Sequence, residues 1–164
     1  MKKMGRKYKA YINGKFVKSK SKEFFNVINP ATEKIIAKAP SCDREDVRDA
    51  INAAKTAFEE WKNTTPAERA SYLYRLADLV EKDLKRLAKI ESLNTGKTIK
   101  YARDSDFPFI IDNLRFFAGA ARTLEGKAAA GYADYHDKNK HKSYGTSLLR
   151  REPIGVIGAI VPWN

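Results

Sequence analysis

The sequence contains few reactive side chains whose neighbouring residues would activate them for chemistry. The only cysteine, Cys42, lies beside Asp43 and close to Glu45, at the start of a predicted helix. A nucleophilic thiolate needs a lowered pKa and usually a basic partner. The helix dipole favours the thiolate, but the two carboxylates oppose it. We therefore expect Cys42 to be inert, and a single cysteine excludes an internal disulfide framework and suits a reducing cytosol.

Two glycine-containing segments resemble parts of phosphate-binding motifs. Gly96-Lys97-Thr98 has the ending of a phosphate-binding loop, but Glu91 stands where that loop needs an earlier glycine, and a predicted helix precedes it. Gly155 and Gly158 lack the spacing of a dinucleotide fingerprint, and no helix follows them. We interpret Gly96 as a helix stop and assign phosphate binding to neither segment.

Metal binding is not expected either. His136 and His141 stand five residues apart in a polar segment. Two imidazoles alone rarely make a metal site. We interpret both as exposed loop histidines.

The charge balance raises the question of an anionic partner. The 164 residues include 32 Lys and Arg against 20 Asp and Glu, a net charge of +12. Basic residues cluster near the start and again at 138–142, so a non-enzymatic nucleic-acid-binding or scaffold module is an alternative function. The aromatic residues, however, fall on apolar helix faces and make no stacking platform for bases. A solvated basic surface is the favoured interpretation.

The composition indicates a folded protein that works in the cytoplasm. Hydrophobic residues make up 43% of the chain, enough for a buried core, and the length suggests one compact domain. The longest apolar run, at 154–163, is too short for a bilayer, which needs about 20 residues. No apolar signal core follows the basic first residues, so we expect neither secretion nor membrane insertion.

Short strands are predicted in the first forty residues. Residues 11–17 read as two β segments about Asn13-Gly14, two residues that tolerate the positive φ of a tight hairpin. A strand at 24–28 stops at Asn29-Pro30, because proline lacks an N–H donor and restricts the residue before it. A further strand is predicted at 34–39.

Capping signals predict three helices between residues 43 and 96. Asp43 is the first N-cap, and Thr65-Pro66-Ala67-Glu68 is a capping box with proline at the first helical position. A break near 82–83 starts the third helix, which stops at Gly96. The predicted buried faces comprise Val47, Ala50, Ile51, Ala54, Phe58 and Trp61 on the first helix, and Leu73, Leu76, Ala77, Val80, Leu84 and Leu87 further on.

The last third of the chain predicts one more helix and two strands. The helix covers 106–126, with Pro108 in its first turn, and the polar segment 131–142 is predicted to be a loop. Residues 143–151 read as a strand, and 155–161 as an almost wholly apolar one. A strand that is apolar on both faces is typical of a parallel sheet covered by helices. The predicted fold class is therefore α/β.

The closing residues 150–164, which end in Pro162-Trp163-Asn164, closely resemble the segment that opens the cofactor domain of NAD(P)-dependent aldehyde dehydrogenases. Other segments resemble the same family in the same order: Tyr11-Ile12-Asn13-Gly14, Asn29-Pro30-Ala31-Thr32, the Trp61 helix, Pro66-Ala67-Glu68-Arg69, Leu93-Asn94-Thr95-Gly96-Lys97 and Phe116-Phe117-Ala118-Gly119. The resemblance spans nearly the whole chain, whereas family members are several times longer. It implies the N-terminal portion of the aldehyde dehydrogenase fold.

This resemblance implies site roles for the last five residues. The side-chain amide of Asn164 would stabilise the oxyanion that forms when a thiolate adds to an aldehyde. The residues that would line the nicotinamide cleft of NAD or NADP are Ile160, Val161, Pro162 and Trp163. The family's nucleophilic cysteine and general-base glutamate match positions beyond Asn164, so we expect the chain alone to be inactive.

The substrate side is implied by residues 106–110, which most resemble members acting on ω-aminoaldehydes or betaine aldehyde. Asp106 would attract a substrate ammonium and Phe109 would offer it a ring face; alternatively, Asp106 only caps its helix. Some members also hold an alkali cation near Val27 and Ile28, but Asn94 replaces the acid that this site uses.

The resemblance also implies a domain division. Residues 1–142 would form the N-terminal hairpin and helical layer of the cofactor-binding domain, 143–152 an oligomerisation β extension, and 153–164 the first strand of the cofactor-binding sheet. The catalytic domain would be absent. The implied partners are a small aldehyde and either identical subunits or a complementing C-terminal part.

Overall fold

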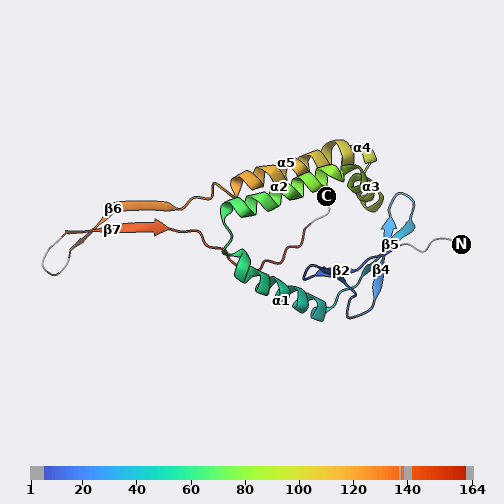
Figure 1. The fold of residues 1–164 in the computed structure, drawn as a ribbon, viewed down its shortest axis with the longest axis horizontal. Helices are drawn as coiled ribbons and strands as arrows, with labels where there is room; N and C mark the ends of the chain where they lie inside the picture. The colour runs from blue at the N-terminus through green and yellow to red at the C-terminus, as the bar shows by residue number, and fades with distance from the viewer. Residues whose placement is uncertain (1–5, 137, 139–141, 162–164) are drawn as a thin grey trace.

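The computed structural model describes residues 6–136, 138 and 142–161, and it has a mixed α/β fold (Figure 1). The strands are β1 (Arg6–Lys7), β2 (Ala10–Ile12), β3 (Lys15–Val17), β4 (Phe24–Asn29), β5 (Lys34–Pro40), β6 (Lys127–His136) and β7 (Lys142–Leu149). The helices are α1 (Arg44–Trp61), α2 (Pro66–Lys82), α3 (Leu84–Thr95), α4 (Ile99–Tyr101), the π-helical turn η1 (Ala102–Asp106) and α5 (Phe107–Ala120).

The N-terminal strands form where the sequence predicts them. Asn13 and Gly14 have φ of 50° and 72°, and the hairpin of β2 and β3 turns at these two residues. Antiparallel β4 and β5 form a sheet with β1, which pairs with β5 in parallel. The two-residue strand β1 was not predicted, because so short a segment shows no alternation of apolar and polar residues.

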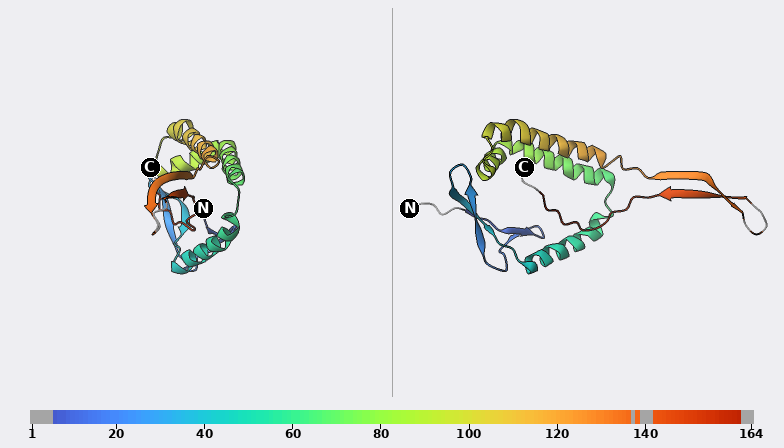
Figure 2. Two further views of the ribbon diagram at one scale, coloured as in Figure 1. Left: turned by 90° about the vertical axis from the view of Figure 1, so that its left-hand side faces the viewer. Right: turned by 180° about the vertical axis from the view of Figure 1, so that it is seen from behind.

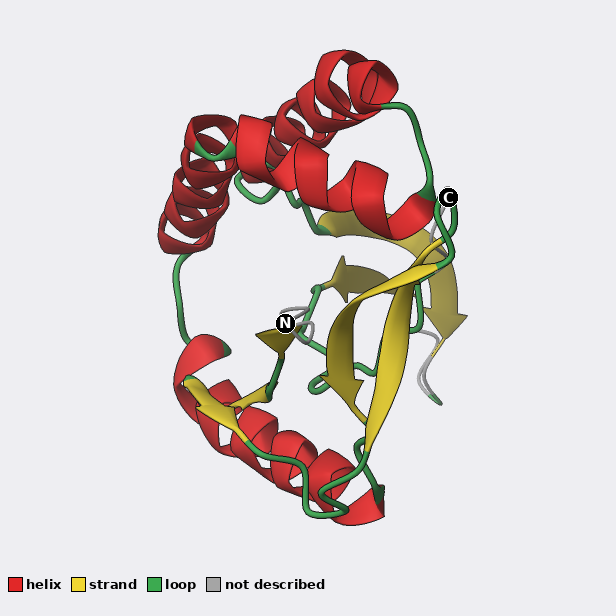
Figure 3. Cartoon of the chain, turned by 90° about the vertical axis from the view of Figure 1, so that its right-hand side faces the viewer, coloured by secondary structure: helices red, strands yellow, loops and turns green. Residues whose placement is uncertain are grey.

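The predicted helix starts are confirmed. Asp43 accepts hydrogen bonds from the backbone of Glu45 and Asp46, and Thr65 and Glu68 form the capping box of α2. Gly96 ends α3 with a φ of 81°, the left-handed conformation that favours glycine. Helices α2 and α5 pack side by side, and α1 lies on the opposite side of the molecule (Figure 2). Strands lie between these two helical groups (Figure 3).

The fourth predicted helix, 106–126, is shorter than expected. It begins as α5 at Phe107, after α4 and η1, and ends at Ala120. Residues beyond Ala120 turn toward the β6–β7 hairpin, where Arg151 Nε donates to the carbonyl of Glu125 at 3.0 Å. A Cβ at Gly126 would lie 2.4 Å from the carbonyl oxygen of Leu149, so glycine permits the close approach of these two backbones.

The prediction of a loop at 131–142 is wrong. Residues 131–136 belong to β6, which pairs antiparallel with β7 from Lys127–Leu149 to His136–Lys142. This hairpin projects from the rest of the molecule (Figure 1). Its ladder rests on backbone hydrogen bonds, which a polar sequence satisfies as well as an apolar one. The predicted strand at 143–151 is confirmed as β7, which ends at Leu149.

The predicted strand at 155–161 is not formed. Residues 150–161 have no regular secondary structure, and Gly155 has a φ of 115°. A strand requires a hydrogen-bonded neighbour, and no described strand pairs with this segment. Ile154 and Ile160 are 90% and 102% exposed. The apolar side chains that suggested a buried strand therefore lie at the surface of the described structure.

The predicted face of α1 is largely exposed, whereas the residues predicted on α2 and α3 are mostly buried or partly buried. Among the described residues, the buried apolar side chains are Ala37, Ala70, Ala77, Ala88, Ala102, Ile111 and Ala118. Val47, Ile51, Trp61 and Leu76, which were predicted to be buried, are exposed. An amphipathic helix buries its stripe only against an opposing surface, and the described residues do not supply one. In this part of the chain no helix has the length and apolar character to span a membrane.

Candidate functional site

A half-buried charge cluster connects the end of α3 to the start of α5. Lys97 Nζ donates to Asp106 Oδ2 at 2.8 Å and lies 3.3 Å from Glu91 Oε1. The side chains of Lys97, Glu91 and Asp106 are 22%, 16% and 21% exposed, so water screens this cluster less than an ordinary surface pair. The hydrogen bond with Asp106 raises the pKa of Lys97 above its ordinary value, and Glu91 adds to this against the opposing effect of burial. Lys97 is therefore an ammonium ion at neutral pH.

Asp106 and Phe109, the predicted substrate residues, lie three positions apart on one helical run. Asp106 has helical backbone angles and makes no side-chain capping hydrogen bond, so the interpretation of Asp106 as a helix cap is wrong. Its carboxylate accepts the hydrogen bond from Lys97 instead. Phe109, in the first turn of α5, is 69% exposed, and its substrate role stays a prediction.

The predicted cofactor residues lie in or beyond the closing segment. Ile160 and Val161 are exposed and have no regular secondary structure. Pro162, Trp163 and Asn164 lie outside the described residues. The roles expected of these five residues therefore stay predictions.

Cys42 has the properties of an unreactive thiol. Desolvation, followed by the nearby charges of Asp46 and Asp43, raises the pKa of the exposed Cys42, and a hydrogen bond with Ser19 offsets only part of this. A raised pKa keeps the thiol protonated at neutral pH, and a thiol is a poor nucleophile. The geometry thus gives Cys42 no catalytic role.

Sequence reasoning missed a polar contact between the N-terminal hairpin and α1. Asp46, buried in the first turn of α1, accepts hydrogen bonds from Ser19 Oγ at 2.9 Å and from the Lys20 N–H at 3.1 Å. Lys20 Nζ also lies 3.3 Å from Asp49 Oδ2. The partners are 26 or more residues apart, a separation at which sequence spacing gives no signal.

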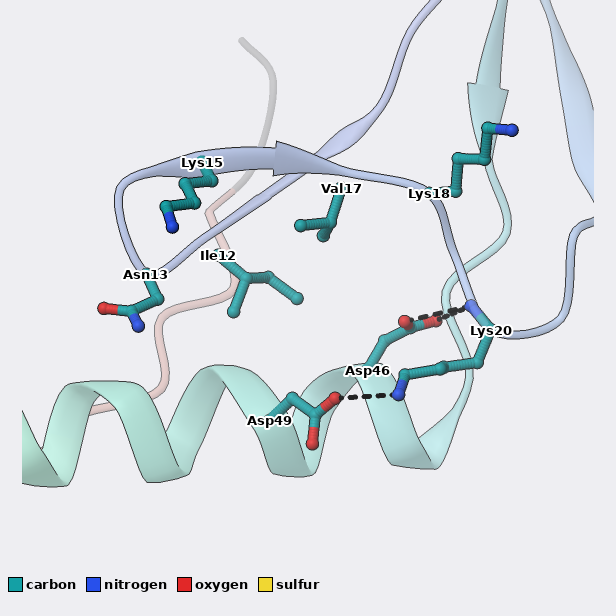
Figure 4. A pocket seen from close by; sticks show the side chains of 8 residues that line it. All are labelled: Ile12, Asn13, Lys15, Val17, Lys18, Lys20, Asp46 and Asp49. Atoms are coloured by element: carbon teal, nitrogen blue, oxygen red, sulfur yellow. Dashed lines mark hydrogen bonds and ion pairs between the residues drawn. The ribbon is translucent and has the colours of Figure 1, made fainter.

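These contacts form one wall of a pocket of about 420 Å³ between the β2–β3 hairpin and α1 (Figure 4). The lining residues are Ile12, Asn13, Lys15, Val17, Lys18, Lys20, Asp46 and Asp49. Both carboxylates that line this pocket already bind Lys20, so neither is an unengaged acid or base. Within the described residues, no three His, Cys, Asp or Glu side chains are grouped as a metal site.

Comparison with known proteins shows the family. The profile of the aldehyde dehydrogenase family matches residues 16–164. Aminoacetaldehyde dehydrogenase of Pseudomonas aeruginosa is 38% identical over 159 residues, which cover 95% of this chain and 30% of that protein. The chain therefore belongs to the aldehyde dehydrogenase family, and it spans about 30% of the length of the curated relatives that it matches.

Solved structures agree. Indole-3-acetaldehyde dehydrogenase in its apo form is 34% identical, with a TM-score of 0.82 over 100% of this chain and 35% of that one. The NAD⁺ complex of an aldehyde dehydrogenase from Bacillus cereus is 37% identical, with a TM-score of 0.73 over 76% of this chain and 26% of that one. The predicted family and α/β fold are confirmed, and the alternative of a nucleic-acid-binding module has no support.

Proposed function

We propose that this chain forms the N-terminal part of the cofactor domain of an NAD(P)-dependent aldehyde dehydrogenase, an enzyme that oxidises an aldehyde to a carboxylic acid. The observation that supports this most strongly is the family match through residue 164, because it includes the segment implied to hold the cofactor and the oxyanion donor. Because β6 (Lys127–His136) pairs with β7, the β extension of the proposed division begins before residue 143. The proposed parts are the N-terminal hairpin and helical layer before residue 127, a β extension that comprises β6 and β7, and, at 153–164, the first strand of the cofactor-binding sheet once neighbouring strands pair with it.

The chemistry assigned to the closing segment is binding and charge stabilisation. NAD or NADP, when bound, accepts a hydride from the substrate carbon. The exposed side chains of Ile160 and Val161 fit a cofactor wall, because ligand clefts are lined mainly by apolar groups; Pro162 and Trp163 complete this wall. The amide of Asn164 donates a hydrogen bond to the oxygen that becomes negative when a thiolate adds to the aldehyde.

The attacking thiolate comes from outside these 164 residues. Cys42 is the only cysteine in the sequence, and its raised pKa opposes thiolate formation. A reaction that needs a nucleophile, a base and a bound cofactor is not supported by one oxyanion donor. The chain therefore contributes part of the site and has no aldehyde turnover of its own.

Asp106 and Phe109 are the proposed substrate residues. The exposed ring of Phe109 offers a face to a substrate ammonium or to an apolar aldehyde. Asp106, three residues earlier, belongs with Glu91 and Lys97 to a cluster of two carboxylates and one ammonium, which favours a cationic substrate. A small aldehyde with a cationic group is the proposed substrate class.

The β6–β7 hairpin is the proposed contact with a second subunit, since it projects from the body with exposed Leu148. The proposed compartment is the cytoplasm, which suits a free thiol.

The test measures aldehyde-dependent reduction of NAD and of NADP. The chain is assayed alone, and again after co-folding with a polypeptide that supplies the remainder of a related enzyme; we call the second sample the reconstituted enzyme. We expect turnover only in the reconstituted enzyme. Asn164→Ala should lower its kcat about 10²-fold to 10³-fold, the usual effect of losing an oxyanion donor, whereas the control Cys42→Ser should leave kcat unchanged. Turnover by the chain alone, or an unaffected Asn164→Ala enzyme, would contradict the proposal.

A further inference from the structure

Two ion pairs hold the carboxylates of the π-helical turn η1, and they differ in burial. Asp106, the last residue of η1, pairs with Lys97 at 2.8 Å, and the two side chains are 21% and 22% exposed. Asp104 pairs with the adjacent Arg103, and these side chains are 45% and 48% exposed. Only the Lys97 pair reaches outside the turn, to the segment that follows α3.

The π-helical turn η1 has an unusual hydrogen-bond pattern directly before α5. Its hydrogen bond runs from the Phe107 N–H to the Ala102 carbonyl, five residues back. This pattern is rare in proteins and is mostly found as single turns within α-helices, frequently at functional sites. Asp106 ends this turn and Phe107 begins α5, so a contact on Asp106 acts where the direction of α5 is set.

The backbone that carries Lys97 is fixed before its side chain reaches Asp106. Ser92 Oγ donates to the Lys97 carbonyl at 2.7 Å, and the Lys97 N–H donates to Thr95 Oγ1 at 3.3 Å. Gly96, the residue before it, packs against the ring of Pro30 from the β4–β5 turn. The Lys97 side chain therefore extends from a rigid base, which is what a positioning contact requires.

We propose that Lys97 is a positioning residue for the substrate: through Asp106 it fixes the first turn of α5, and so places the ring of Phe109 in the substrate entrance. This inference rests on the proposed function, which assigns Phe109 to that entrance. Lys97 does not touch the substrate. Lys97 holds Phe109 in the binding geometry before the substrate arrives, so substrate binding does not have to supply the free energy of ordering this ring. The effect is therefore on substrate affinity rather than on the rate of the chemical step.

The experiment measures KM and kcat of the reconstituted enzyme with an uncharged aromatic aldehyde, so that the charge of Asp106 has no direct effect. Lys97→Met should raise KM about tenfold while kcat changes less than about twofold, the signature of lost uniform binding. Lys97→Arg should restore most of the affinity, because a guanidinium also pairs with a carboxylate. The matched control is Arg103→Met, which removes the exposed pair on the same turn and should leave KM unchanged.

Hydrogen exchange of the backbone amides gives a second readout in the 164-residue chain itself. Lys97→Met should speed exchange at 102–111 and leave α1 unaffected, whereas Arg103→Met should leave exchange in both regions unchanged. If Lys97→Met speeds exchange at every amide, the chain has unfolded. Asp106→Asn, which keeps the side-chain shape but removes the charge that pairs with Lys97, then takes its place and should also raise KM.

The outcomes separate this inference from the proposed function. If the wild-type reconstituted enzyme oxidises aldehydes and Lys97→Met behaves like Arg103→Met, the positioning role is wrong and the proposed function stands. If the wild-type reconstituted enzyme oxidises no aldehyde, both are wrong.

Discussion

The ring of Pro30 occupies the space that a side chain on Gly96 would need. Pro30 Cγ lies 2.9 Å from the position of a Cβ on Gly96, and Gly96 has a φ of 81°. One residue belongs to the turn between β4 and β5, and the other ends α3. The contact therefore joins the N-terminal sheet to the helical layer directly before Lys97.

We predict that Gly96→Ala destabilises the chain more than the same change at Gly14. Both glycines have positive φ, which costs an alanine about 1–2 kcal/mol. At Gly14 nothing lies within 4 Å of the added methyl group, whereas at Gly96 the proline ring must move. Overpacking of this kind adds roughly 1–3 kcal/mol. Urea unfolding followed by circular dichroism measures both variants, and equal losses would show that the Pro30 contact is unimportant.

Thr65→Ala should destabilise α2 by about 1 kcal/mol, the usual cost of a lost N-cap. Thr65 Oγ1 accepts from the Glu68 N–H at 3.2 Å, and Glu68 Oε2 accepts from the Thr65 N–H at 2.7 Å. The control is Thr56→Ala in α1, where the hydroxyl bonds only to the carbonyl one turn back. That change should be neutral or slightly stabilising, because alanine is the better helix former. The stabilities of the two variants are compared by their unfolding midpoints in urea. If T56A lost as much stability as T65A, the capping role would be contradicted.

Acid should weaken the contact between the N-terminal hairpin and α1. Burial raises the pKa of Asp46, but hydrogen bonds from the Asp43 N–H, the Ser19 hydroxyl and the Lys20 N–H outweigh it, so the pKa lies below its ordinary value. The folded state then binds the proton less readily than the unfolded chain. The stability from Asp46 is complete above the ordinary aspartate pKa of about 3.9 and is lost as pH falls through the folded-state pKa.

Thermal unfolding of the wild type and Asp46→Asn, measured between about pH 7 and about pH 3, tests this assignment. The variant should be less stable at neutral pH and should lose less stability on acidification. Asp49→Asn is the control, since Asp49 only pairs with the Lys20 side chain at the surface. An Asp46→Asn profile parallel to the wild type would show that another group carries the acid sensitivity.

The isolated chain should associate in dilute solution. Ile154, Ile157 and Leu148 are largely exposed, and apolar patches and unpaired strand edges favour association. Sedimentation velocity at several concentrations should show species larger than a monomer. If β7 carries the contact between chains, Leu148→Lys should reduce the amount of these larger species. If the closing segment carries it, Ile157→Lys should do so. A sharp, cooperative melt of a monomer would contradict this prediction.

Local signals in the sequence determined the ends of most N-terminal elements. The sequence predicted the hairpin turn at Asn13-Gly14, the helix starts at Asp43 and Thr65, and the helix end at Gly96. These signals are local, because each one involves backbone groups within a few residues. The family was also evident from ordered segments, and the comparisons confirmed it. The sequence by itself therefore predicted the fold class, which the comparisons confirmed. It also supplied the candidate site residues at 106, 109 and 160–164, whose roles stay predictions.

Only the tertiary structure decided which of these elements acquire partners. A polar segment became strand β6 because β7 lies beside it, and the apolar segment 155–161 formed no strand because no neighbour does. The contacts Ser19–Asp46, Pro30–Gly96 and Arg115–Glu81 join residues far apart in the sequence. Spacing reports the period of a single helix or strand, whereas pairing and burial depend on the surface that another part of the chain presents.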